Sequence, residues 1–212
     1  MSNESGLAPG KAAGSAAGQV WQESPLVGVA ALLCQHQAAA SKQFRLDEKA
    51  FCDIANVRGD AADPAFVLAV ESVTGCRPPA QPNTVARGNG YDILWLGPDE
   101  WLARSQQAQP ATLERKLADA LAGQFASAVD VGSGYTVLEA SGEKVRDVIA
   151  RGCPFDLHPR VFAPGQCAQS HYFKASIVLV PIRDDAFEIV VRRSFADYFC
   201  RIMLDAALPL MS

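Results

Sequence analysis

Apolar residues along this chain change their spacing several times, and each change predicts a switch between strand and helix. Between Asp63 and Gly75 they recur three and four residues apart, which is the spacing of one helix face. Asp63 is a favourable N-cap, Pro64 suits the first helical position, and Gly75 is a common residue just past a helix end. The pattern therefore predicts a helix over Pro64–Thr74.

The next segment predicts a hairpin and a second helix. Thr84–Ala86 and Tyr91–Leu96 have the composition of strands and flank Gly88-Asn89-Gly90, whose residues tolerate a positive φ. Gly97-Pro98-Asp99-Glu100 ends the second strand, and we expect this turn to lead into a helix. Leucines four residues apart then indicate an amphipathic helix over Ala111–Ala122.

The second half of the chain repeats this order of elements. Ser127–Ala140 predicts one long strand, and the short helix that begins near Ser141 ends at Gly152. Three strands follow, and a last helix, capped by Ser194, ends before Pro209. The three strands are expected at Gln166–Lys174, Ile177–Ile182 and Phe187–Val191.

The segments nearest the N-terminus give less definite patterns. Leu26–Ala31 and Phe44–Ile54 alternate as strands do, whereas Val29–Ala40 also has the composition of a short helix. We leave these two interpretations open. Met1–Gly18 is rich in Gly, Ala and Ser and has too little apolar bulk to build a core, which indicates a flexible tail.

The order of elements predicts the fold class and the domain organisation. Each half is expected to run strand, helix, strand, strand, helix, which is typical of an α+β fold with antiparallel sheets and helices packed on them. We expect residues 1–24 to form the flexible tail and residues 25–212 to form a single domain. That domain would consist of two pseudo-repeat halves, about 25–125 and 126–212.

Composition excludes several classes of function. Hydrophobic residues at 49% and charged residues at 20% are the values of a globular chain, and a net charge of −4 is unlike that of a nucleic-acid binder. No apolar stretch approaches the roughly 20 residues of a membrane-spanning helix. The N-terminus lacks the basic and apolar regions of a secretory signal, so we expect a cytoplasmic protein.

The cysteines do not have the spacing of a metal site. Zinc sites use closely spaced pairs of ligands, whereas no two cysteines here form a C-x-x-C pair. We therefore expect free thiols and no metal ligands in this chain. The six cysteines are Cys34, Cys52, Cys76, Cys153, Cys167 and Cys200.

Three further sequence features resemble sites but are better explained as structure. Gly132-x-Gly134 lies within a strand-like run, whereas a dinucleotide fingerprint requires the glycines between a strand and a helix. We therefore interpret it as a strand bend or a close backbone approach. Cys153, Asp156 and His158 could supply a nucleophile, an orienting acid and a base, but such sets assemble in space and not along one loop. Asp99-Glu100 reads as part of a turn. We expect no catalytic or cofactor-binding residues.

Four motifs together carry a resemblance to a known family. They are YDILWLGPDEWL at Tyr91–Leu102, PNT at Pro82–Thr84, DVGSGYTVL at Asp130–Leu138 and DLHPRVFAPGQCAQ at Asp156–Gln169. These stretches resemble the gamma subunit of heterotetrameric sarcosine oxidase, and the resemblance runs from about Ser24 to about Ala207. The duplicated layout also resembles the folate-binding fold of the glycine-cleavage aminomethyltransferases.

The resemblance implies a non-catalytic structural subunit of a larger enzyme. Such a complex oxidatively demethylates sarcosine to glycine and forms hydrogen peroxide and 5,10-methylenetetrahydrofolate. It also implies that FAD, FMN, NAD, zinc and tetrahydrofolate belong to the other subunits, so that the partners of this chain are the alpha, beta and delta subunits. The alternative is a free-standing, folate-dependent enzyme like the aminomethyltransferases.

The long loop Cys153–Gly165 is the predicted partner interface. Its three prolines restrict the backbone, which lowers the entropy lost on binding. A loop of this length in a compact domain is commonly functional. The expected contacts are apolar anchors with polar neighbours at the rim, and the residues are Phe155, Leu157, His158, Arg160 and Phe162. The alternative is that the apolar side chains fold back as a satellite core.

Overall fold

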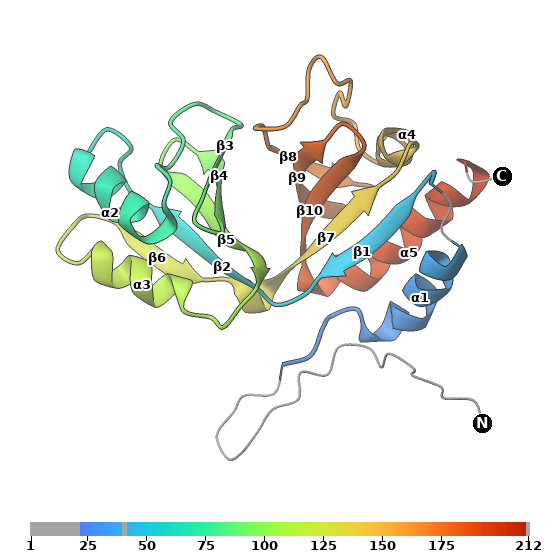
Figure 1. The fold of residues 1–212 in the computed structure, drawn as a ribbon, viewed down its shortest axis with the longest axis horizontal. Coiled ribbons are helices and arrows are strands. Elements are labelled where there is room, and N and C mark those ends of the chain that lie inside the picture. Colours follow the sequence, from blue (N-terminus) through green and yellow to red (C-terminus); the bar gives the residue numbers. More distant parts are fainter. Residues whose placement is uncertain (1–21, 40–41, 211–212) are drawn as a thin grey trace.

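The computed structural model describes residues 22–39 and 42–210 and folds them into two five-stranded antiparallel sheets whose inner faces meet (Figure 1). Helices cover the outer face of each sheet. The predicted α+β class, with antiparallel sheets and packed helices, is therefore confirmed. The tail predicted over residues 1–24 lies outside the described residues except for its last three positions.

The first sheet has the strand order β3-β4-β5-β2-β6. The helices α2 (Pro64–Thr74) and α3 (Leu113–Ala120) pack on its outer face. The strands are β2 (Cys52–Arg58), β3 (Val85–Gly88), β4 (Tyr91–Gly97), β5 (Glu100–Ala108) and β6 (Ser127–Asp130).

The second sheet has the strand order β1-β7-β10-β9-β8. Three helices pack on its outer face, α1 (Ala30–Ala39), α4 (Val145–Ala150) and α5 (Ala196–Ala207). The strands are β1 (Arg45–Lys49), β7 (Tyr135–Ser141), β8 (Ala168–Tyr172), β9 (Ala175–Arg183) and β10 (Ala186–Arg192). Short 3-10 helices lie at Val27–Val29, Gly132–Gly134, Arg193–Phe195 and Leu208–Leu210.

Local sequence signals account for the elements that were predicted correctly. The carboxylate of Asp63 accepts a hydrogen bond from the Ala65 N–H at 2.9 Å, and Gly75 closes α2 with a φ of 73°. In the β3–β4 hairpin, Asn89 and Gly90 both have positive φ, 42° and 81°. Two positive values are what a tight hairpin turn of the favoured hand requires.

The chain passes between the sheets where the sequence predicted continuous strands. Phe44–Ile54 is split into β1 and β2 at Phe51, which has a φ of 60°. The long strand predicted over Ser127–Ala140 is also wrong, because β6 ends at Asp130 and β7 begins at Tyr135. Between them the Gly134 N–H donates to the Val131 carbonyl at 2.9 Å, so a turn replaces the strand ladder.

Two other expectations are corrected. The turn after β4 leads into β5 and not into a helix, and Trp95 pairs with Trp101 across the hairpin. β5 is buried on both faces from Trp101 to Ser105, so its sequence lacks the alternation that identifies a half-buried strand. Ser194 does not cap α5, since that helix begins after the 3-10 turn at Arg193–Phe195 and has no side-chain cap.

Each half of the chain contributes one strand to the sheet of the other half. β1 pairs with β7 in the second sheet, with Leu46 opposite Ala140. β6 pairs with β2 in the first sheet, with Val57 opposite Ala128. The strands of one sheet therefore do not all come from one side of residue 125, where we expected the boundary between the two halves. The two pseudo-repeat halves remain a proposal about how the sequence is organised.

The inner faces of the sheets form a third apolar layer between them. It is built by Ile54, Leu94 and Leu102 from the first sheet and by Val137, Val180 and Val190 from the second. All six side chains are at most 3% exposed. Burial of this layer holds the two sheets against each other.

Candidate functional site

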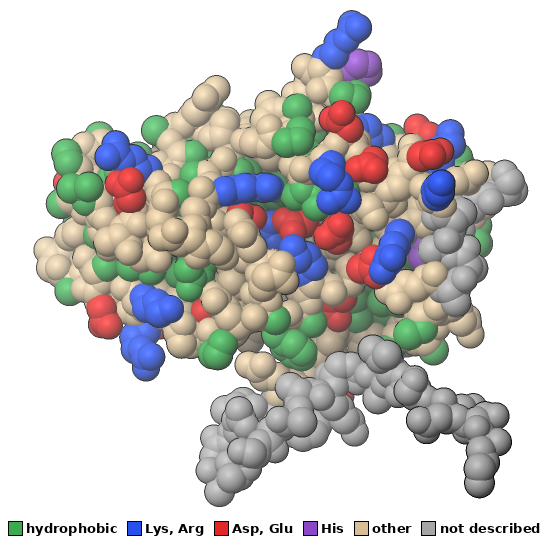
Figure 2. Space-filling model, viewed as in Figure 1, with side chains coloured by type: hydrophobic (Ala, Val, Ile, Leu, Met, Phe, Trp, Pro, Cys, Tyr) green, Lys and Arg blue, Asp and Glu red, His purple; other side chains and the backbone are tan. Residues whose placement is uncertain are grey.

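Four charged side chains lie at the junction of the two sheets and form one buried ion cluster. Arg104 of β5 is fully buried, and its Nη2 donates to Asp92 Oδ2 at 2.8 Å and to Glu188 Oε2. Lys49 of β1 donates to the other oxygen of Glu188 at 2.5 Å. The cluster links β4 and β5 of the first sheet to β1 and β10 of the second. Figure 2 shows further acidic and basic side chains gathered over β1 and β7.

The electrostatics of the ion cluster hold the carboxylate of Glu188 ionised. Burial acts to raise the pKa of Glu188, but the Arg104 charge and the hydrogen bonds from Lys49 and Arg104 outweigh burial and hold that pKa below its ordinary value. Asp92 also accepts a hydrogen bond from Gln106 at 2.8 Å. These carboxylates are occupied by neighbours from their own chain, which indicates a structural role and not general acid–base chemistry.

The other residues considered for chemistry also have structural partners. Cys153 is 5% exposed and its Sγ lies 3.4 Å from Ser170 Oγ, whereas the exposed His158 accepts a hydrogen bond at Nδ1 from the Arg160 N–H. Asp156 accepts from the backbone N–H of His158 and not from its ring. None of these contacts joins thiol, imidazole and carboxylate in the order that a nucleophilic triad needs.

The Asp99-Glu100 pair belongs to an ion pair on the β4–β5 turn. Arg58 lies 3.4 Å from an oxygen of Asp99 and 2.7 Å from an oxygen of Glu100. The amide of Asn56 donates to the second oxygen of Glu100 at 2.8 Å. The interpretation of this pair as part of a turn agrees with these contacts.

The loop Cys153–Gly165 divides into a buried part and an exposed part. Phe162 is 1% exposed and packs edge-on against Phe155, with 4.9 Å between ring centres. Leu157 is 6% exposed and belongs to the core of the second sheet. Leu157 and Phe162 therefore cannot be the apolar anchors that the sequence suggested, because the chain buries them itself. His158 and Arg160 are exposed at the tip.

Arg146 of α4 hydrogen-bonds to the backbone of this loop on both sides of its tip. Its Nη1 donates to the carbonyl oxygens of Leu157 and Phe162, and its guanidinium lies 4.8 Å from the centre of the Phe187 ring. Burial lowers the pKa of Arg146. These contacts hold the loop in one conformation and so present its tip as a preformed surface.

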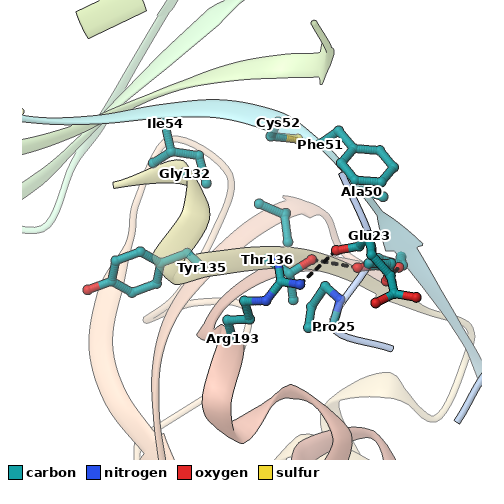
Figure 3. A pocket seen from close by; sticks show the side chains of 13 residues that line it. Glu23, Pro25, Ala50, Phe51, Cys52, Ile54, Gly132, Tyr135, Thr136 and Arg193 are labelled. Atoms are coloured by element: carbon teal, nitrogen blue, oxygen red, sulfur yellow. Dashed lines mark hydrogen bonds between the residues drawn. The ribbon is translucent and has the colours of Figure 1, made fainter. Parts of the chain in front are cut away.

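A small polar cavity lies where the chain crosses between the sheets (Figure 3). Its volume is about 40 Å³, which is room for a few water molecules and not for a substrate or a flavin. Glu48 accepts hydrogen bonds from Ser24 at 2.5 Å and Thr136 at 2.7 Å, and Arg193 donates to the Glu23 carbonyl at 2.8 Å. The hydrogen bonds around the cavity therefore hold the crossing segments together.

The thiols provide a direct test of this structure. Cys34 is exposed and the other five cysteines are buried. Burial raises the pKa of Cys167 to about 11 and that of Cys200 to about 12, and only the thiolate reacts. At pH 8 a thiol reagent should therefore modify Cys34 rapidly and the buried thiols slowly, whereas unfolding should expose all of them. Cys34→Ser should abolish the fast phase; a second fast thiol would contradict the burial.

Two classes of site find no support in the part of the chain that the structure describes. Within residues 22–39 and 42–210, no three His, Cys, Asp or Glu side chains are grouped closely enough to hold a metal ion. In the same residues, no helix is long and apolar enough to cross a membrane.

Comparison with known structures first defines the class of fold. The chain is similar to the glycine cleavage system aminomethyltransferase T from Bartonella henselae, with a TM-score of 0.57 and 12% identity over 81% of this chain and 48% of that protein. At this identity the likeness shows the fold alone. The predicted resemblance to the aminomethyltransferase fold is confirmed.

The family follows from closer relatives. Residues 58–208 match the sarcosine oxidase, gamma subunit family, and the chain belongs to this family. It is 31% identical over 186 residues to the sarcosine oxidase subunit gamma of Corynebacterium sp. (strain P-1), covering 87% of this chain and 89% of that protein. It is 29% identical over 189 residues to the subunit gamma of Arthrobacter sp.. The family predicted from the four sequence motifs is confirmed.

A solved assembly contains a chain of the same shape. The heterotetrameric sarcosine oxidase from Corynebacterium sp. U-96, in complex with pyrrole 2-carboxylate, matches with a TM-score of 0.81 and 28% identity. The match covers 90% of this chain and 97% of that chain. The likeness therefore extends over both sheets.

Proposed function

We propose that this chain is the structural gamma subunit of a heterotetrameric sarcosine oxidase. The observation that carries the proposal is the match to a chain of such an assembly over nearly its whole length. The family assignment over residues 58–208 points to the same function. A subunit of this kind stabilises an enzyme by contact and does not itself contain the reacting groups.

The absence of catalysis in this chain is part of the proposal and rests on how its chemical groups are used. The buried charges of Arg104 and Glu188 form an ion pair across the two sheets. Burial raises the pKa of Cys52, Cys76, Cys167 and Cys200, so these thiols are not activated nucleophiles. Chemistry would then belong to the partner chains.

The proposed complex has the alpha, beta and delta subunits as the partners of this chain. In it, FAD, FMN, NAD, zinc and tetrahydrofolate would be held by those subunits, and sarcosine would be converted to glycine with formation of hydrogen peroxide and 5,10-methylenetetrahydrofolate. Five buried free thiols agree with a cytoplasmic location. The alternative of a free-standing aminomethyltransferase-like enzyme has only the shared fold in its favour.

The tip of the loop Cys153–Gly165 is one docking surface in this proposal. His158 and Arg160 are exposed there, and Val161 beside them is 51% exposed. The buried aromatic rings beneath them hold the tip in place, so a partner would meet an ordered surface with one positive side chain. The docking contact expected from the sequence is thereby limited to the exposed residues.

Co-purification tests the proposed function. A tagged copy of this chain, produced together with the three candidate partner chains, should recover all of them in a yellow complex that forms peroxide from sarcosine. The isolated chain should be colourless and inactive, because the flavins and the reacting groups belong to the partners. Recovery of the tagged chain alone, or turnover by the isolated chain, would contradict the proposal.

A further inference from the structure

The inner face of the second sheet carries a row of four polar side chains beyond the apolar layer. In the sheet register Tyr135 lies opposite Arg192, and His171 lies opposite Ser176. Val191 lies opposite Ile177, which places Arg192 beside Ser176 and completes the row. We call this row the ledge. It crosses four strands in the order Tyr135, Arg192, Ser176, His171 and spans about 14 Å, since neighbouring strands are about 4.8 Å apart.

The ledge lies where the first sheet no longer covers the second. The adjacent row on the same face contains Val137, Val190 and Val178, and these belong to the apolar layer between the sheets. In the next row on this face, two residues further along each strand, Arg192, Ser176 and His171 are exposed. A groove of about 430 Å³ lies over the ledge, with Val178 and Val190 among its lining residues.

Within the described part of the chain, the residues that line the groove carry positive charge and no negative charge. Among the described residues that line it none is acidic, and Arg192 supplies a permanent positive charge. The Arg192 guanidinium lies 5.3 Å from the centre of the Tyr135 ring and makes no ion pair with any residue that the structure describes. Six other exposed arginines pair with carboxylates, namely Arg45, Arg58, Arg77, Arg87, Arg183 and Arg201. The exposed Arg115, Arg151, Arg160 and Arg193 make no ion pair with the described residues either, but they do not lie over this apolar-backed groove. The guanidinium of Arg192 is thus held on an aromatic ring and left without a carboxylate.

We infer that the ledge docks an extended acidic segment of a partner subunit, with a carboxylate of that segment on Arg192. Its span of about 14 Å matches about four residues of extended chain at roughly 3.3 Å each. A polypeptide fits better than a small ligand, because a binding pocket normally encloses most of a small molecule whereas Arg192, Ser176 and His171 are exposed. This inference rests on the proposed function, since it names a surface by which the subunit would join its complex.

Charge reversal in the assembled complex tests the inference. With the tagged chain and its partner subunits produced together, Arg192→Glu should lower recovery of the partners about tenfold, whereas Arg192→Lys should keep most of it. The matched control is Arg115→Glu, because Arg115 is exposed on α3 and makes no ion pair with the described residues. The control should assemble as the unaltered chain does. Melting of each isolated chain should stay within about 2 °C, which separates docking from folding.

A photo-crosslinking residue at position 176 identifies the occupant. In the assembled complex it should attach to a partner peptide that contains Asp or Glu. Unchanged assembly of the Arg192→Glu chain, or attachment to a segment without acidic residues, would overturn the docking inference alone. If the unaltered chain recovers no partner, the proposed function fails and the inference fails with it. Binding of free glutamate through Arg192, with assembly unaffected, would show a small-anion site and also overturn docking.

Discussion

Arg104→Ala should lower the free energy of unfolding by about 3–5 kcal/mol, because it removes the buried cation that two buried carboxylates share. Arg104 is fully buried and joins Asp92 of one sheet to Glu188 of the other. Lys49, at 2.5 Å from Glu188, and Arg87, at 3.6 Å from Asp92, are more exposed and offset only part of the loss. Chemical denaturation monitored by fluorescence and circular dichroism measures the change.

An exposed ion pair provides the control for this experiment. Arg45 lies 2.5 Å from Asp47, but its side chain is 58% exposed, so Arg45→Ala should change the free energy of unfolding by less than about 1 kcal/mol. A similar small loss for Arg104→Ala would contradict the role given to the ion cluster.

The same cluster predicts a dependence of stability on pH. The pKa of Glu188 in the folded chain lies below its unfolded value of about 4.3, so its ionised form stabilises the fold at higher pH. That contribution is complete above the unfolded pKa and is lost as the pH falls through the folded pKa. The loss of stability on acidification below about pH 4.5 should therefore be shallower in Glu188→Gln.

Phe162→Ala should also lower the free energy of unfolding by about 3–5 kcal/mol, because it empties a buried aromatic site. Phe162 contacts Phe155 edge-on and lies against Phe187, with 6.2 Å between ring centres. The neighbouring Val161 is 51% exposed, so Val161→Ala should change stability by less than about 0.5 kcal/mol. Thermal melting of the two variants provides the comparison.

Assembly distinguishes the buried part of the loop from its tip. The Phe162→Ala chain that remains folded should still join its partners, whereas His158→Ala combined with Arg160→Ala should fold normally and assemble several-fold less well. If the double variant melts early and assembles normally per folded molecule, the tip belongs to the core and the docking proposal for it is wrong.

Local signals in the sequence were sufficient for the elements that depend on a few neighbouring residues. The cap at Asp63 and the stop at Gly75 defined α2 to the residue. The positive-φ residues Asn89 and Gly90 likewise defined the β3–β4 hairpin. Such elements are predictable because their energetics are contained within one or two turns.

The crossings between the sheets were not predictable in this way. Nothing in the alternation of apolar residues distinguishes one long strand from two strands that continue in different sheets, and both segments concerned, Phe44–Ile54 and Ser127–Ala140, were misassigned as continuous. The distinction depends on pairing with residues far away in the sequence, such as Leu46 with Ala140. Tertiary pairing therefore overrode the local pattern.

The ion cluster was missed although the sequence contains a signal for it. Asp92, Arg104 and Glu188 are each the single charge within the buried run of their strand. Such residues are rarely buried without partners, and the signs of these three balance in part. The loop Cys153–Gly165 was recognised as unusual, but burial of Leu157 and Phe162 could be seen only once the loop was placed on its own core.

The exchange of strands between the sheets has a consequence for the order in which the chain folds during synthesis. β1 has no pairing partner until residues 135–141 have left the ribosome, and β2 lacks one neighbour until residues 127–130 have done so. A nascent chain of about 125 residues therefore carries an open strand edge, which is a site for mispairing with other chains. Contacts of such wide sequence separation also slow folding. The two halves must reach the native state together, so the complete chain, and not either half, is the unit that folds.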